Sequence, residues 1–298
     1  MNEYIGQIAA VTTAVCWAIT STNFEAAGKK IGSVPLNIIR LFIGFIFLST
    51  FTLITRGQIL PFDASLNAWK WLTISGFIGF FIGDLLLFEA FIRIGARISM
   101  LIFASVPPMS GILAYIILGE SMSQKQIIGM IVTLIGISIV ILVKDEGSKK
   151  IKLSHSVSGI LFAFGGAFGQ SLGYIVGKLG LGNYNPFAAT QIRIISAMVA
   201  FSLFFTIKRN WHLVFDSFKE HKAMIRVTIG SFFGPFLGVS LSLLAVQHIN
   251  PGVASTLMAI TPILLIPVAI FIKKEKVFFK EILGAFIAVI GVSVIFIF

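Results

Sequence analysis

Long apolar runs separated by short polar connections cover almost the whole chain. A membrane-spanning helix needs about 20 mainly apolar residues, and in lipid its backbone groups must be hydrogen-bonded within the segment, which favours helices. The alternating ten-residue segments typical of a membrane β-barrel do not occur. We therefore predict an all-α integral membrane protein with ten transmembrane helices. The ten runs are residues 5–24, 36–55, 69–92, 98–118, 126–143, 157–177, 187–207, 227–247, 253–272 and 281–298.

The second half of the chain repeats the first. With the numbering shifted by 155, residues 79–143 align with residues 234–298 without a gap. The aligned pairs share proline, glutamate, lysine and glycine, which chance does not explain in an apolar chain. We predict two five-helix repeats, residues 1–143 and 157–298, joined by a linker at 144–156. The pairs are Gly79 with Gly234, Gly83 with Gly238, Pro107 with Pro262, Glu120 with Glu275, Lys125 with Lys280, Gly129 with Gly284 and Gly136 with Gly291.

Five spans per repeat turn the second repeat upside down relative to the first. Inverted repeats place a substrate site near the middle of the bilayer, at their mutual interface, and let one half rock on the other. The site then faces each side of the membrane in turn. This architecture favours a secondary transporter of a small-molecule substrate. A channel-like facilitator with a central polar cavity and a scaffold that transports nothing remain as alternatives.

Basic residues are divided unevenly between the connections. The connections that follow the odd-numbered spans hold 17 lysines and arginines, and the other connections hold 4. The positive-inside rule places the first group in the cytoplasm. The charge distribution therefore predicts that both termini lie outside.

Composition narrows the class of protein. The chain is 57% hydrophobic and 12% charged, against roughly 25% charged residues in soluble domains, so its main solvent is the lipid bilayer. The single Cys16 excludes an internal disulfide, and the four histidines lie in connections, so we expect no metal site and no cofactor. The net charge of +11 is spread over short loops that flank lipid headgroups, and we expect no nucleic-acid partner.

The sequence shows helix faces lined by glycine and helices that contain proline. Glycines that recur every four residues lie on one face of the sixth and eighth predicted helices. Such faces allow close helix approach, either as static packing or as surfaces that slide during transport. Prolines inside the fourth and ninth predicted helices bend them, either as gates or as simple bent packing. The glycines are Gly165, Gly169, Gly173, Gly177, Gly230, Gly234 and Gly238, and the prolines are Pro107, Pro108, Pro262 and Pro267.

Asp84 is the most informative side chain. It lies deep in the third predicted helix, with no basic residue one turn away. A charged carboxylate in the membrane is costly, so we expect Asp84 to be protonated, paired or in a wet cavity. An intramembrane carboxyl group suits proton coupling. The alternative is a neutral aspartic acid that is hydrogen-bonded to the backbone of a neighbouring helix.

Arg40 and Arg193 lie near the starts of the second and seventh predicted helices. Their positions favour snorkelling to headgroups or structural pairing, and the alternative is that they hold an anionic substrate group or pair with Asp84.

Glu89 and Arg93, four residues apart, predict a salt bridge within one helix. Carboxylates before the fifth and tenth helices, from Glu120 and Glu275, stabilise helix starts.

The first and sixth predicted helices carry polar and aromatic groups. If the repeats are related by symmetry, these two helices face each other across the cavity. Their side chains suit a small zwitterionic or aromatic ligand. The candidates are Trp17, Ser21, Asn23 and Glu25 on the first helix and Gln170 and Tyr174 on the sixth.

Taken together, these positions resemble the drug/metabolite transporter superfamily, in particular EamA-type transporters with two five-helix domains. The resemblance covers essentially the whole chain, although Lys274 stands where the second repeat of such proteins usually has glycine. The residues that carry it are Trp17, the Pro-Leu-Asn-Ile-Ile-Arg run 35–40, Gly83–Asp84 followed by Ala90, Pro107, Gly119–Glu120, Gly129 and Gly136, then Pro262, Glu275, Gly284 and Gly291.

The resemblance implies a secondary transporter with a cavity between its halves, often an exporter of amino acids or other metabolites. It also implies cytoplasmic termini, against the charge distribution. A nucleotide-sugar or drug-type carrier of the same superfamily is the alternative. An intramembrane aspartyl protease would need a second membrane aspartate, and a primary pump a phosphate-binding loop; the sequence has neither. Our hypothesis is export of a small metabolite across the plasma (bacterial inner) membrane, coupled to protons through Asp84.

Overall fold

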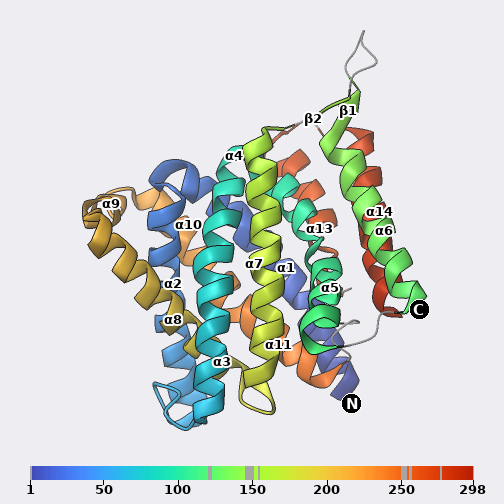
Figure 1. Ribbon diagram of the computed structural model, residues 1–298. Coiled ribbons are helices and arrows are strands. Elements are labelled where there is room, and N and C mark those ends of the chain that lie inside the picture. The colour runs from blue at the N-terminus through green and yellow to red at the C-terminus, as the bar shows by residue number, and fades with distance from the viewer. Residues whose placement is uncertain are drawn as a thin grey trace.

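The computed structural model describes residues 2–119, 123–144, 151–153, 155–249, 254, 257–275 and 277–297. These residues form a helical bundle (Figure 1), as predicted. The first half contains α1 (Asn2–Ile31), α2 (Ser33–Arg56), α3 (Leu66–Gly76), the π-helix η1 (Phe77–Gly83), α4 (Asp84–Phe103), α5 (Val106–Leu118) and α6 (Gln124–Ile141).

The second half follows a similar order of elements, with α9 and the π-helix η3 as additions. A short antiparallel pair, β1 (Leu142–Lys144) and β2 (Ile151–Leu153), precedes it within the predicted linker, of which residues 145–150 and 154 lie outside the described ranges. The elements are α7 (Val157–Leu181), α8 (Pro186–Lys208), α9 (Trp211–Ser217), α10 (His221–Ser231), the π-helix η2 (Phe232–Gly238), α11 (Val239–His248), α13 (Thr261–Pro267), the π-helix η3 (Val268–Ile272) and α14 (Phe279–Ile297).

The sequence offset of 155 reappears in where elements begin. The π-helices η1 and η2 start at Phe77 and Phe232, and α6 and α14 start at Gln124 and Phe279. The amino end of the chain lies at the end of the bundle opposite the β1–β2 pair (Figure 1). This is the arrangement that an odd number of spans in the first half requires.

Judged by length and composition, the described residues contain fewer membrane-spanning helices than the ten predicted. Among the described residues, six helices are long and apolar enough to cross a membrane, or up to seven if a bent pair is one span. That pair, Leu66–Phe103 with Val106–Ile117, bends by 53°. The count of ten remains a prediction, because the ninth predicted span, 253–272, includes residues 253, 255 and 256, which lie outside the described part.

The breaks lie at glycine and proline, at positions that differ from the prediction. Gly95 interrupts α4 with a φ of 79°, so the connection between the third and fourth predicted spans shrinks to one non-helical residue. Pro107 and Pro262 occupy the first turns of α5 and α13 instead of helix interiors. A proline there has no intrahelical hydrogen bond to lose. The bend before Pro107 is therefore a junction between two helices.

The two halves interlock through the glycine faces. A Cβ on Gly169 would lie 2.7 Å from Gly83 Cα, and one on Gly173 would lie 3.1 Å from Gly79 Cα. The stripe on α7, which Gly165 and Gly177 extend against Leu86 and Ser75, thus packs on α3, η1 and α4. The stripe on α10 and η2 packs on α1 in the same manner. There Gly230 faces Phe24, Gly234 faces Thr20 and Gly238 faces Trp17.

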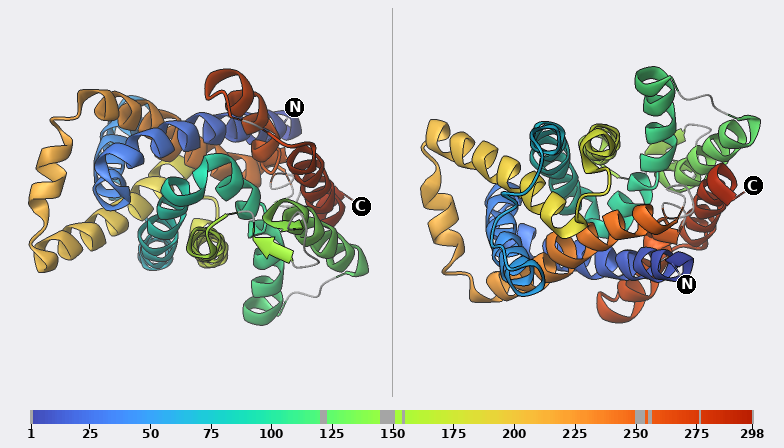
Figure 2. Two further views of the ribbon diagram at one scale, coloured as in Figure 1. Left: turned by 90° about the horizontal axis from the view of Figure 1, so that it is seen from above. Right: turned by 90° about the horizontal axis from the view of Figure 1, so that it is seen from below.

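The last helices of the two halves, α6 and α14, pack against each other. α6 and α14 approach so closely that a Cβ on Gly136 would lie 2.3 Å from the backbone nitrogen of Ala288. End-on views show this green and red pair at one edge and the gold α9 region at the other (Figure 2). The glycines lie at close helix contacts in all three places; static packing and sliding during transport both stay predictions.

Candidate functional site

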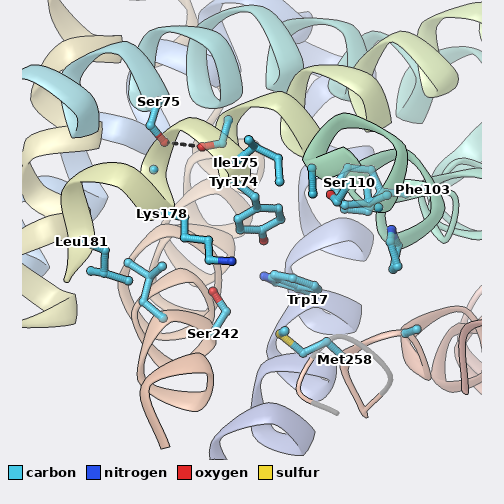
Figure 3. Close-up of a pocket in the computed structure, with 18 of the residues that line it drawn as sticks. Trp17, Ser75, Phe103, Ser110, Tyr174, Ile175, Lys178, Leu181, Ser242 and Met258 are labelled. Atoms are coloured by element: carbon cyan, nitrogen blue, oxygen red, sulfur yellow. Dashed lines mark hydrogen bonds between the residues drawn. The ribbon is translucent and has the colours of Figure 1, made fainter. Parts of the chain in front are cut away.

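A cavity of about 730 Å³ lies between the halves. Trp17 of α1, Ser110 of α5, Tyr174 of α7 and Ser242 of α11 contribute to its wall, and Figure 3 shows Trp17, Tyr174 and Ser242 directed toward a shared space. The volume is in the range of pockets for small organic ligands. The wall extends to Asn183 in the α7–α8 connection, at the end of the bundle where the chain begins (Figure 1).

A second cavity of about 80 Å³ adjoins the first at its inner end. Trp17, Tyr174 and Arg193 line both cavities, and Arg40, Asp84 and Gln170 line the smaller one. Six of the seven substrate or coupling candidates from the sequence therefore meet here. The seventh does not: Asn23 is absent from the described lining of both cavities and donates to the carbonyl of Ile19 on its own helix.

Asp84 is held by two neighbouring helices. Its Oδ2 accepts a hydrogen bond of 2.5 Å from Arg40 Nη2 on α2, and its Oδ1 accepts one of 2.7 Å from Gln170 Nε2 on α7. Arg40 and Asp84 are 3% and 5% exposed, so the pair is buried. Of the states expected for Asp84, pairing is the one observed. The sequence around Asp84 does not indicate this partner, because Arg40 lies 44 residues away in the chain.

Arg193 of α8 lies on the other side of this cluster and has a different environment. It is 2% exposed, and its guanidinium stacks 4.4 Å from the ring of Phe80. Its Nε and Nη2 are buried and have no hydrogen-bond partner among the residues that the structure describes. Snorkelling is wrong for both arginines, because each is buried in the protein and not at its lipid surface.

The difference between the arginines follows from the repeat. Shifting Asp84 by 155 leads to Val239, the first residue of α11 and another lining residue of the smaller cavity. The second half thus has an arginine early in its second span but a valine where the first half has the carboxylate. With ionised side chains, Arg40, Asp84 and Arg193 together carry one excess positive charge.

At the opposite end of the bundle, ion pairs join the two halves. The buried Glu25 of α1 accepts a hydrogen bond from the backbone N–H of Ala96, next to the break at Gly95, and pairs with Lys273, which follows η3. Arg97 pairs with Glu281 of α14 at 2.7 Å. These contacts lie at the end of the bundle that holds the connections after the odd-numbered spans. Lys29, four residues after Glu25, also pairs with it at 2.6 Å, and this i,i+4 spacing is the sequence signal that could have indicated an ion pair here.

The other roles predicted for carboxylates have different outcomes. Glu89 and Arg93 form the predicted salt bridge at 2.8 Å. The helix-start role of Glu275 is wrong, because α14 begins four residues later and Glu281 accepts a hydrogen bond from the N–H of Phe278 there. Glu275 instead lies 3.6 Å from Arg97. Glu120 lies outside the described residues. No group of three metal-ligating side chains occurs in the described part of the chain.

Comparisons with known proteins agree with this architecture. The EamA-like transporter family matches residues 4–142 and again residues 157–297. An uncharacterized transporter of Archaeoglobus fulgidus is 23% identical over 291 residues, which cover 95% of this chain and 94% of the relative. A protein of known crystal structure superposes with a TM-score of 0.66 at 13% identity, over 97% of this chain and 95% of its own. That last likeness concerns the fold alone.

Proposed function

The chain belongs to the EamA-like transporter family of the drug/metabolite transporter superfamily, and from this premise we propose that it exports a small metabolite, such as an amino acid, by alternating access. The observation that carries the proposal is the asymmetry along the bundle axis. The large cavity extends from the Asp84 cluster toward the end where the chain begins, and ion pairs between the halves occupy the other end. A carrier in one of its two states has this form.

A channel is less compatible with this geometry. Continuous conduction needs an open path through one conformation, whereas Glu25 with Lys273 and Arg97 with Glu281 tie the halves together across the axis. Inverted repeats open such contacts by rocking one half on the other. The uneven distribution of basic residues favours a cytoplasmic position for the ion-pair end. The structure then corresponds to the outward-facing state.

Asp84 is the proposed proton-coupling group. Its carboxylate accepts hydrogen bonds from Arg40 and Gln170, and a proton that binds there removes the negative charge that balances the Arg40 guanidinium, which favours withdrawal of that guanidinium. Protonation is thereby tied to a movement of α2 against α4. An ammonium group of a bound amino acid and a proton would compete for this carboxylate, and competition of that kind is what proton-driven export requires.

Transport in proteoliposomes tests the proposed function. Protein reconstituted with a labelled amino-acid mixture inside should release label along an imposed proton gradient, with saturation and exchange against external unlabelled ligand. Asp84→Asn keeps the size and an amide for hydrogen bonding but removes titration, so its flux should lose dependence on the gradient. Glu89→Gln, which alters a carboxyl group on the same helix outside the cavity, is the control. Gradient-driven release that is unchanged in Asp84→Asn rules out the coupling role.

A ligand screen by thermal stability narrows the substrate class. A ligand present at 100 times its Kd stabilises the folded protein by about 2.7 kcal/mol, which a melting experiment in detergent detects. Ligands that raise the melting temperature then enter the flux assay. If no compound that binds is also transported, the carrier proposal fails and the scaffold alternative gains support.

A further inference from the structure

The larger cavity is electropositive. Among the described residues that line it, the side chains that carry charge at neutral pH are Lys178 and Arg193, and none is acidic. Lys178 belongs to α7, one turn beyond Tyr174, and Figure 3 shows its amino group directed into the cavity beside Trp17. Walls of one sign concentrate ligands of the opposite sign. The cavity thus favours anions at its mouth as well as at its inner end.

Arg193 is the group that needs a ligand. Lys178 is exposed, whereas Arg193 is buried with two nitrogens unpaired in the described structure. A buried charge without hydrogen-bonded compensation is costly. The carboxylate that compensates Arg40 has its repeat counterpart at Val239, so the chain supplies no equivalent for Arg193 at that position.

We infer that the transported molecule carries one carboxylate, which takes the place of the missing counter-ion and binds Arg193. A guanidinium presents paired N–H donors that match a carboxylate in bidentate geometry. One negative charge neutralises the excess of the Arg40, Asp84 and Arg193 cluster, whereas a phosphate dianion exceeds it. The inference names the recognition group of the transport proposed above and rests on that proposal.

The rest of the wall defines the other part of the ligand. Trp17, Met100 and Phe103 line both cavities near Arg193, and they provide an apolar surface for an aliphatic or aromatic body. A simple amine is disfavoured, because it lacks the carboxylate that binds Arg193 and would meet the positive charges of Arg193 and Lys178 in the larger cavity. The predicted ligand class is therefore a monocarboxylate with an apolar body, with or without an amino group.

Matched probes in a binding assay test the inference. The panel pairs 3-phenylpropanoate, phenylalanine, leucine and 4-methylpentanoate with their primary amides, and adds 3-phenylpropylamine and phenyl phosphate. Calorimetry and melting temperature on purified protein in detergent should show that at least one carboxylate binds about 30-fold or more tightly than its amide, the loss expected when a buried charge pair is broken. In Arg193→Gln the carboxylate and its amide should bind equally.

Two further variants keep the test decisive. Arg193→Lys retains the charge but not the paired donors and should bind the carboxylate with intermediate affinity, which covers the case that Arg193→Gln does not fold. Lys70→Gln removes an exposed charge of α3 outside the cavity and should leave binding unchanged.

Four outcomes overturn the inference: an amide or the amine that binds as tightly as its carboxylate, undiminished carboxylate binding in Arg193→Gln, tighter binding of phenyl phosphate, or no binding by any carboxylate of the panel. Flux in proteoliposomes separates this inference from the proposed function. Arg193-dependent binding without flux contradicts transport and leaves the recognition group standing, whereas flux of neutral ligands supports transport and contradicts the carboxylate.

Discussion

The two buried arginines should respond differently to the same substitution: a large loss of stability for Arg40→Met and little change for Arg193→Met. In Arg40→Met, Asp84 loses the partner that lies 2.5 Å away, in a pair whose side chains are 4% and 8% exposed. Removing one member of a buried pair costs about 3–5 kcal/mol. In Arg193→Met, relief of the unpaired donors, worth about 1–3 kcal/mol, is offset by loss of the cation–π contact with Phe80, about 1–2 kcal/mol.

The free energy of unfolding measures this difference. Unfolding in mixed micelles with increasing dodecyl sulfate, followed by far-UV circular dichroism, should place Arg40→Met about 3–5 kcal/mol below the unaltered protein and leave Arg193→Met close to it. Adding Asp84→Asn to Arg40→Met should restore much of the loss, because the stranded carboxylate is then neutral. Equal destabilisation by the two arginine substitutions, or additive effects of Arg40→Met and Asp84→Asn, would refute the pairing argument.

Three other predictions concern packing, topology and the ion-pair end. Gly169→Ala should destabilise by about 1–3 kcal/mol through overpacking against Gly83, whereas Gly111→Ala, whose Cβ meets only Met130 Sδ at 3.9 Å, should be neutral or stabilising in the same unfolding assay. Cysteines placed at the amino end and in the linker 144–156 should react with impermeant reagents from opposite sides of the membrane; reaction from one side contradicts inverted repeats. Glu25→Gln weakens the contact with Lys273 and should shorten the distance distribution between spin labels across the cavity mouth, and an unchanged distribution would count against a gate there.

Much of the fold is visible in the sequence because lipid makes strict demands on it. Long apolar runs predict helices, and the offset of 155 between Gly79 and Gly234 extends to the π-helices and the last helices of both halves. The breaks were harder to place. A proline that starts a helix, as Pro107 does, and one that lies inside a helix give the same apolar run, and Gly95 looks like any membrane glycine until its φ is known.

The site was predictable only in part. The symmetry of the repeats correctly brings Trp17 on α1 toward Gln170 and Tyr174 on α7. It does not indicate which side of the helix each side chain faces, and Asn23 does not line the cavity. Ion pairs between distant helices, such as Arg40 with Asp84, have no local signal. Charged residues of the connections were interpreted as facing headgroups, although Arg97 and Lys273 bind carboxylates of the protein. The transport roles of the site residues stay proposals.

Side-specific labelling of one cavity residue tests alternating access most directly. In a Cys16→Ala background, Ser110→Cys provides a single thiol in the wall of the large cavity. In oriented vesicles it should react rapidly with an impermeant methanethiosulfonate from the face that holds the termini and only slowly from the other. Adding Glu25→Gln should raise labelling from the opposite face by about tenfold, the effect of about 1.4 kcal/mol. Equal labelling from both faces without that substitution would reveal a continuous pore and contradict a carrier.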